Sequence, residues 1–245
     1  MTGRAHWHPI RLLSWNILHG GGPNRMPEIA LWIIGQSPDV VVLTEFRRSV
    51  GGQIVGVLAD YGLKHSISTR PGPGENGVLI ASRMPLAVSV AQPEGAPFRG
   101  RWLGVTLQES GMGVLGVHVP DDTRPTDKSL FWRELVNFAK ARPPGDWVVA
   151  GDFNTGRHRL DEEGETFGAT ALLGAFCTAG FDDAWRTKHP ERREYSWVSR
   201  TGSGFRMDHA FVSEGLRARV SSVSYAHDVR ERRLSDHSAL MLELA

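Results

Sequence analysis

The stretch DWVVAGDFN, residues 146–154, determines how the rest of this chain is interpreted. Its apolar run, Trp147 to Ala150, predicts a short buried strand that Gly151 ends. Asp152 and Asn154 follow two residues apart, so an extended backbone would point both side chains the same way. Such groups at the end of a buried strand suit chemistry better than packing, although a polar corner that caps the next segment would use the same residues.

The bulk properties describe a protein that fits one large domain or two small ones. The chain has 245 residues and a formal net charge of +1, which neither demands nor excludes nucleic acid as a partner. Its single cysteine, Cys177, allows no intrachain disulfide and makes a thiolate zinc site improbable. Met1 to Pro9 contain no apolar core of signal-peptide length, and no run is long enough to span a bilayer. We therefore expect a cytoplasmic protein with no membrane partner.

Short apolar runs divided by helical segments indicate a sheet-rich α/β sandwich, with two packed sheets and helices outside. Strands are predicted at residues 10–15, 40–43, 147–150, 195–198, 205–212, 220–224 and 239–244, and helices at 26–36, 52–61, 126–141 and 167–179. Between them, residues 63–69, 77–82, 86–91, 102–108 and 113–118 predict a meander of antiparallel strands. We see no linker, so residues 1–245 are expected to form a single domain.

Polar side chains follow or interrupt many of these buried runs. They are Asn16, Glu45, His118, Asp152, Asn154, Asp208, Asp236 and His237. One such residue is usually a cap, but so many strand ends predict a polar cluster at one rim of the sandwich. Carboxylates that converge there repel one another unless a cation neutralises them. Oxygen ligands favour Mg²⁺, for which Mn²⁺ can substitute, over zinc.

Six short motifs occur in the order in which the endonuclease/exonuclease/phosphatase superfamily carries them, and they make the chain resemble that superfamily. They are Ser14-Trp15-Asn16, Leu43-Thr44-Glu45, Gly116-Val117-His118-Val119-Pro120, Gly151-Asp152-Phe153-Asn154, Arg206-Met207-Asp208 and Ser235-Asp236-His237. The resemblance implies the deoxyribonuclease I-like α/β fold, a four-layer sandwich of two packed mixed β-sheets flanked by helices. It also implies metal-dependent hydrolysis of phosphate esters.

The resemblance further implies roles for individual residues. Glu45 would be the principal metal ligand, with Asn16 and Asp236 beside it. Asp152 would orient or deprotonate the attacking water, and Asn154 and His118 would hold phosphate oxygens. Asp208 would accept a hydrogen bond from His237 and keep that imidazole protonated against the phosphate.

The first loop departs from the family pattern. Many relatives place a second polar residue two positions after the first asparagine, but here that position is Leu18. Metal coordination from this strand would then rest on Asn16 alone. We interpret His19 and His209 as structural or solvent-exposed residues, although His19 lies in the first loop of the rim.

The residues from 180 to 208 resemble the exonuclease III and abasic endonuclease branch. In that branch an aromatic residue and two apolar residues around an arginine wall a pocket for a base-less sugar, which predicts Trp197, Phe205 and Met207 as the wall. Arg157 and Arg206 complete the expected substrate-binding residues, because a phosphate backbone needs basic partners. The alternatives are that the wall residues belong to the core and that the basic residues form a solvated surface.

We therefore expect an enzyme, a Mg²⁺-dependent DNA nuclease of the abasic endonuclease or 3′-exonuclease kind that acts in DNA repair as a monomer. The loop between Trp197 and Phe205 is short, however, whereas relatives that grip duplex DNA carry a longer one. A phosphoesterase for RNA, nucleotides or a lipid headgroup is the first alternative. A binding module that lost activity is the second, and the complete polar set argues against it.

Overall fold

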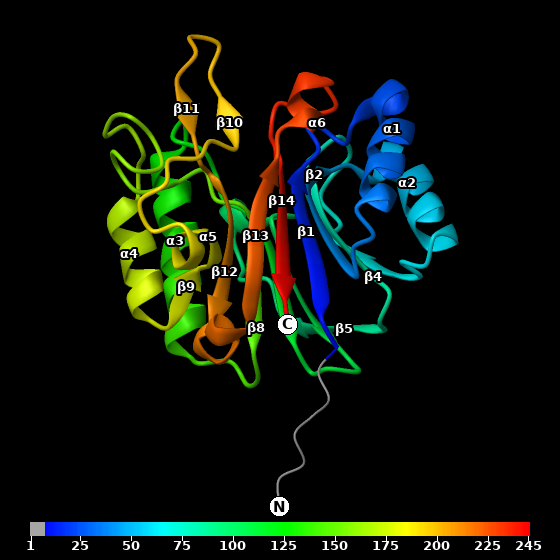
Figure 1. Ribbon diagram of the computed structural model, residues 1–245, viewed down its shortest axis with the longest axis horizontal. Helices are drawn as coiled ribbons and strands as arrows, with labels where there is room; N and C mark the ends of the chain where they lie inside the picture. The colour runs from blue at the N-terminus through cyan, green and yellow to red at the C-terminus, as the bar shows by residue number, and fades with distance from the viewer. Residues whose placement is uncertain (1–7) are drawn as a thin grey trace, which may run out of the picture.

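Two six-stranded sheets pack face to face, with helices on both outer faces (Figure 1). This computed structural model describes residues 8–245. The expected four-layer sandwich with mixed sheets is therefore confirmed. The prediction that Met1 to Pro9 contain no signal peptide concerns a segment that lies almost wholly outside the described residues.

The first sheet has the strand order β13-β14-β1-β2-β4-β3. Its strands are β1 (Ile10–Asn16), β2 (Val40–Phe46), β3 (His65–Ser68), β4 (Gly77–Ser82), β13 (Val220–Ala226) and β14 (Ala239–Leu244). Helices α1 (Gly22–Gly35) and α2 (Arg48–Asp60) cover its outer face (Figure 1).

The second sheet has the order β5-β6-β7-β8-β12-β9. Its strands are β5 (Leu86–Val90), β6 (Trp102–Leu107), β7 (Gly113–His118), β8 (Trp147–Asp152), β9 (Phe181–Asp183) and β12 (Asp208–Ser213). Helices α3 (Pro125–Lys140) and α4 (Thr170–Thr178) pack on its outer face. The remaining elements are short: α5 (Ala184–Lys188), α6 (Asp228–Glu231), two 3-10 turns (Ala96–Phe98 and Glu214–Arg219) and the hairpin of β10 (Trp197–Val198) and β11 (Gly204–Phe205).

Alternation along each strand divides the apolar side chains among three clusters. On β1, Leu12 faces the other sheet, whereas Leu13 and Trp15 pack under the helices. On β8, Val148 and Ala150 point between the sheets, and Val149 points toward α3 and α4. Burial on both faces explains why these strands consist of unbroken apolar runs.

Several sequence-based expectations differ from the structure. The predicted meander is wrong as one unit, because β3 and β4 belong to the first sheet and β5 to β7 belong to the second. The predicted strand over residues 205–212 is interrupted after Phe205 and resumes at Asp208. Strand β9 and helices α5 and α6 were not predicted, and each has at most five residues. Within residues 8–245, no helix has the length and apolarity needed to cross a membrane.

Candidate active site

Strand register in the second sheet places three of the predicted polar residues side by side. The parallel pairing of β7 with β8 sets His118 opposite Asp152, and the antiparallel pairing of β12 with β8 sets Asp208 opposite Asp152. Gly151 permits this approach, because a Cβ there would lie 1.9 Å from the Val117 carbonyl oxygen, and its φ is 147°. Asp152 thus occupies the centre of the row.

The first sheet contributes Asn16 and Glu45 from the neighbouring ends of β1 and β2. Glu45 lies in a bulge of β2 with a φ of 55°, an uncommon conformation for a residue other than glycine. The Asn16 Nδ2 atom lies 3.2 Å from Glu45 Oε1 and donates to Asp152 Oδ2 at 3.0 Å. The Asn16 amide therefore connects the two sheets at the rim.

His237 completes the row through Asp208. Its Nδ1 lies 2.8 Å from Asp208 Oδ2, and oxygen or nitrogen atoms of Asp152, Asp208 and His237 all lie within 4.8 Å of one another. Burial disfavours the imidazolium, but the Asp208 charge and hydrogen bond outweigh it and raise the pKa of His237 to about 10. His237 is therefore a cation at neutral pH.

Burial prevails at Asp152 and His118, where it favours the neutral forms, in contrast to His237. Burial, reinforced by the Asp208 carboxylate, raises the pKa of Asp152 to about 7. Burial and the nearby cations Arg101 and His237 hold the pKa of His118 well below its ordinary value, so this ring is neutral. Its Nε2 lies 3.8 Å from Asp152 Oδ2, beyond hydrogen-bond distance. A carboxylate that titrates near neutrality is suited to accept a proton from water.

Asn154 reaches the site through a turn, not through the extended backbone that its spacing suggested. Its φ is 47°, and its N–H donates to Asp152 Oδ1 at 2.9 Å. Its Nδ2 donates to the Val119 carbonyl at 2.9 Å, and the buried Lys128 ammonium donates to the Asn154 carbonyl. These contacts fix the amide beside Asp152.

The residues expected to hold a metal ion supply oxygen donors. Glu45 is partly exposed; its Oε1 lies near the Asn16 amide, and its Oε2 accepts from the His19 backbone N–H. Asp236 is exposed, and its Oδ2 accepts from Trp197 Nε1 at 3.1 Å. The Asn16 amide donates to a carboxylate, and its Oδ1 accepts from the Leu18 N–H at 3.0 Å. Carboxylate and amide oxygens fit a hard divalent cation.

The three predicted wall residues lie together beside this row. Trp197, Phe205 and Met207 are all half-buried, and the rings of Trp197 and Phe205 are 5.7 Å apart. Trp197 also lies 6.5 Å from the His237 ring. Apolar surface thus remains accessible next to the row of polar residues, whereas a position in the core would have buried it.

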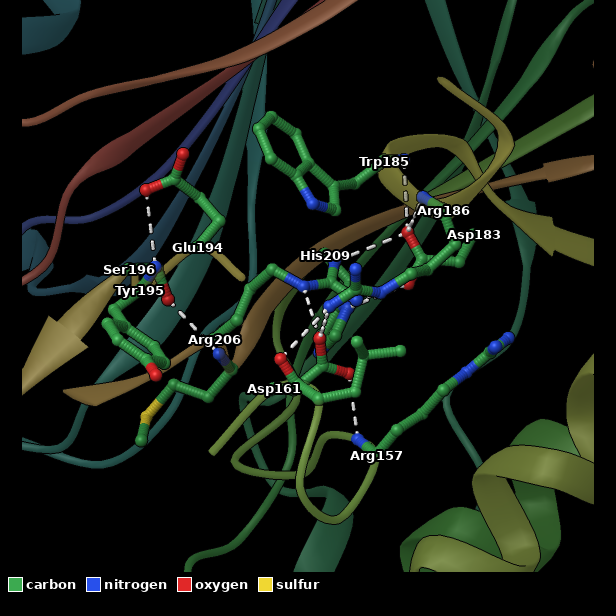
Figure 2. A network of polar contacts seen from close by, with 12 residues as sticks. Arg157, Asp161, Asp183, Trp185, Arg186, Glu194, Tyr195, Ser196, Arg206 and His209 are labelled. Atoms are coloured by element: carbon green, nitrogen blue, oxygen red, sulfur yellow. Dashed lines mark hydrogen bonds and ion pairs between the residues drawn. The ribbon is translucent and has the colours of Figure 1, made fainter. Parts of the chain in front are cut away.

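Arg206 does not face a substrate, and this expectation is corrected. Its guanidinium is fully buried and forms ion pairs with Asp161 at 2.7 Å and Asp183 at 2.6 Å, as Figure 2 shows. The strand breaks after Phe205, and the buried carboxylates of Asp161 and Asp183 hold the guanidinium inside. Arg157 is exposed, and its side chain extends away from this network (Figure 2) and interacts with Cys177 on α4. Within residues 8–245, no contact joins Arg157 to the row of His118, Asp152, Asp208 and His237.

Two side chains at the site, Arg101 and His19, were not among the predicted site residues. Arg101 donates to the His118 carbonyl at 3.3 Å and interacts with the charges of Asp152 and Glu45. His19 contacts Glu45 at 2.7 Å. The position of Arg101 just before an apolar strand was the available signal, whereas nothing in the sequence showed which way His19 turns.

A two-sheet sandwich whose rim joins buried carboxylates to a cationic imidazole defines a hydrolase of phosphate esters. The model of the Endonuclease/Exonuclease/phosphatase family matches residues 13–237. The chain belongs to this family, which confirms the resemblance seen in its motifs and the prediction of a nuclease-type phosphodiester hydrolase.

Comparisons with individual proteins agree with this assignment. The chain is 24% identical to an exodeoxyribonuclease of Bacillus subtilis (strain 168), over 95% of this chain and 98% of that one. Its fold matches an AP endonuclease from Archaeoglobus fulgidus with a TM-score of 0.83 and 19% identity. It also matches a Neisseria 3′ phosphatase bound to a product DNA hairpin, with a TM-score of 0.81 and 22% identity. Both structural matches cover 96% of this chain and 99% of the other chain.

Proposed function

We propose that this protein is a Mg²⁺-dependent DNA phosphodiesterase of the abasic endonuclease or 3′-processing kind that acts in DNA repair, as a monomer in the cytoplasm. The observation that carries the hydrolytic part is the row of His118, Asp152, Asp208 and His237 at one rim. It combines a proton acceptor and a cationic proton donor within a few ångströms of each other.

We assign complementary roles to the two ends of this row. Asp152 takes the proton of the attacking water, for which its raised pKa suits it. His237, held by Asp208 with Nδ1 toward the carboxylate, presents its Nε2–H to a phosphate oxygen or to the leaving oxygen. Asn154 and His118 position the phosphate between them. Mg²⁺ held by Glu45, Asn16 and Asp236 would neutralise charge on the phosphate.

Three features support DNA with a missing base as the substrate. The accessible apolar side chains of Trp197, Phe205 and Met207 lie beside the row and would accept a base-less sugar. Flipping a nucleotide out of the duplex costs least where no base pairs or stacks. The relatives with matching folds include an AP endonuclease and a phosphatase bound to DNA. Action on RNA, a nucleotide or a lipid headgroup is the competing proposal, because the same row serves any phosphate ester.

The test compares substrates with the purified protein. Labelled abasic duplex, intact duplex, duplex with a 3′-phosphate, single-stranded DNA and RNA are each incubated with Mg²⁺ and with chelator. We expect abasic or 3′-blocked duplex to be processed well above intact duplex, and chelator to abolish the reaction. Trp197→Ala should reduce this preference more than it reduces hydrolysis of a small generic phosphodiester. Cleavage of RNA alone, or full activity in chelator, would contradict the proposal.

A further inference from the structure

The loop between β1 and α1 has an unusual backbone that turns His19 toward Glu45. Residues 18–22 all have positive φ, from 50° at Leu18 and 54° at His19 to 78° at Gly20. A left-handed leucine followed by a left-handed histidine is costly and usually marks a functional constraint. A Cβ at Gly20 would lie 2.9 Å from side-chain atoms of Arg47 and Val50, so the loop is closely packed.

His19 contacts Glu45 through two groups. Its backbone N–H donates to Glu45 Oε2 at 2.7 Å, and its ring Nδ1 lies 2.7 Å from the same oxygen. Its side chain is 57% exposed and that of Glu45 is 14% exposed, so an ion from solvent can reach this pair.

The His19 ring is held in place from a second side. Arg47 Nε donates to Asn76 Oδ1 at 2.7 Å, which directs the Asn76 amide nitrogen toward His19 Nδ1 at 3.3 Å. Nδ1 and Glu45 Oε2 are only 2.7 Å apart, so one cation can bind to both atoms.

We propose that His19 is a nitrogen ligand of the divalent cation held by Glu45, and that it makes this site prefer Mn²⁺ to Mg²⁺. His19 would supply the metal-binding atom that position 18 does not, because the side chain of Leu18 has no donor atom. Imidazole nitrogen strengthens binding of transition metals much more than binding of Mg²⁺, which favours oxygen. The inference rests on the metal site of the proposed function.

The experiment uses the full chain, stripped of metal with chelator and titrated with Mn²⁺ or Mg²⁺ alone. Calorimetry measures both affinities, and pulsed electron paramagnetic resonance of bound Mn²⁺ detects coupling to a ligand ¹⁴N nucleus. We expect ¹⁴N coupling in the wild type and its loss in His19→Gln, which keeps a polar oxygen. Mn²⁺ affinity should fall about tenfold or more in that variant while Mg²⁺ affinity changes little. His65→Gln on β3, at the far edge of the first sheet, is the matched control and should retain the coupling.

The outcomes separate this inference from the proposed metal site. Failure of Mn²⁺ to bind the wild type, or binding unaffected by Glu45→Gln, would overturn the site and the inference together. Binding that Glu45→Gln weakens, with ¹⁴N coupling and Mn²⁺ affinity retained in His19→Gln, would overturn the inference alone. Thermal unfolding in chelator checks that His19→Gln is folded, and His19→Asn provides a second variant for the same comparison.

Discussion

The buried position of Asp152 makes its ionisation unfavourable in the folded state. Asp152 is 1% exposed and lies opposite a second buried carboxylate, Asp208, so ionising it is unfavourable, and its pKa is raised to about 7. The unfolded chain ionises this carboxyl near pH 4. Its ionisation therefore destabilises the metal-free protein progressively as the pH rises from about 4 to about 7, and fully above that range.

Asp152→Asn should consequently gain stability and lose activity. In chelator at pH 8 we expect the variant to be more stable by about 2–3 kcal/mol, since relief of a pKa shift of this size is offset by loss of the Asn16 hydrogen bond. Turnover with metal should fall by about 10² or more, because the proton acceptor is gone. Chemical denaturation at several pH values and steady-state kinetics measure the two effects.

The pH dependence is the discriminating part of this prediction. The stability gain should shrink as the pH falls toward 4, where Asp152 is protonated in both states, and it should shrink on addition of Mg²⁺. A gain that is independent of pH, or turnover close to that of the wild type, would show that Asp152 is not the buried base. Asp60→Asn, the same substitution at an exposed residue at the end of α2, is the control and should change neither stability nor turnover.

At this scale the sequence predicted which residues lie at the ends of strands, but it did not predict the direction in which every side chain points. Asp152 and His118 end apolar strands and Asp208 begins one, and burial on both faces fixes the register of these strands, so their meeting was foreseeable. Arg206 has the same apolar neighbours, yet it points inward, because the break in the strand after Phe205 and the carboxylates of distant residues decide its environment. The roles assigned to these residues remain predictions.

At the scale of elements, a buried ionic network fixes the segments that frame the apolar wall. Arg206, before β12, pairs with Asp183 at the end of β9 and with Asp161 in the loop after β8. Arg186 of α5 also pairs with Asp161 (Figure 2). Because Phe205 and Met207 flank Arg206, the network determines where these wall residues lie.

Arg206→Met should be strongly destabilising. It leaves two buried carboxylates short of a partner, which typically costs about 3–5 kcal/mol. Burial opposes ionisation, but Arg206 prevails and lowers the pKa of Asp161 and of Asp183. Lowered carboxyl pKa values contribute stability that is present above about pH 4 and is lost as the pH falls. The deficit of the variant should therefore be largest near pH 7 and smaller in acid, as denaturant titrations would show.

Arg217→Met provides the matched comparison, because Arg217 also pairs with an aspartate, Asp182, at 2.6 Å, but on the surface. Exposed pairs contribute little, so this variant should unfold almost like the wild type. Equal effects of the two substitutions, or a deficit for Arg206→Met that does not depend on pH, would contradict a stabilising role for the buried network.

The elements themselves were predicted where the apolar runs are long. Strands β4 and β7 have the predicted bounds. Helix α3 begins and ends within one residue of its own predicted bounds. Short elements such as β9 and α5 escaped prediction, because three to five residues carry no measurable period. The allocation of β3 to β7 between two sheets depends on contacts across the core, which local patterns do not encode.

At the scale of the whole molecule, ion pairs occupy part of the cationic surface that residues 8–245 could offer to a polyanion. Several arginines are engaged in ion pairs: Arg159 pairs with Glu165, Arg192 with Glu194 and Arg232 with Glu28. The β10–β11 hairpin and α6 rise from the same end of the sandwich (Figure 1). They carry the exposed residues Arg200, at the turn of the hairpin, and Arg233, just after α6.

We expect binding to duplex DNA to be weak and strongly dependent on salt, with these two arginines contributing part of that dependence. Each phosphate contact adds about 0.9 to the slope of log K against log salt concentration. Arg200→Gln with Arg233→Gln should lower the slope by about one to two units and weaken binding to abasic and intact duplex alike, because backbone contacts carry no information about the base. Fluorescence anisotropy across salt concentrations, in Ca²⁺ to prevent cleavage, measures the slope. Arg142→Gln, in the turn before β8 at the opposite end of that strand from Asp152, should leave it unchanged. An unaltered slope in the double variant, or an equal loss in Arg142→Gln, would mean that DNA does not cross the rim between the hairpin and α6.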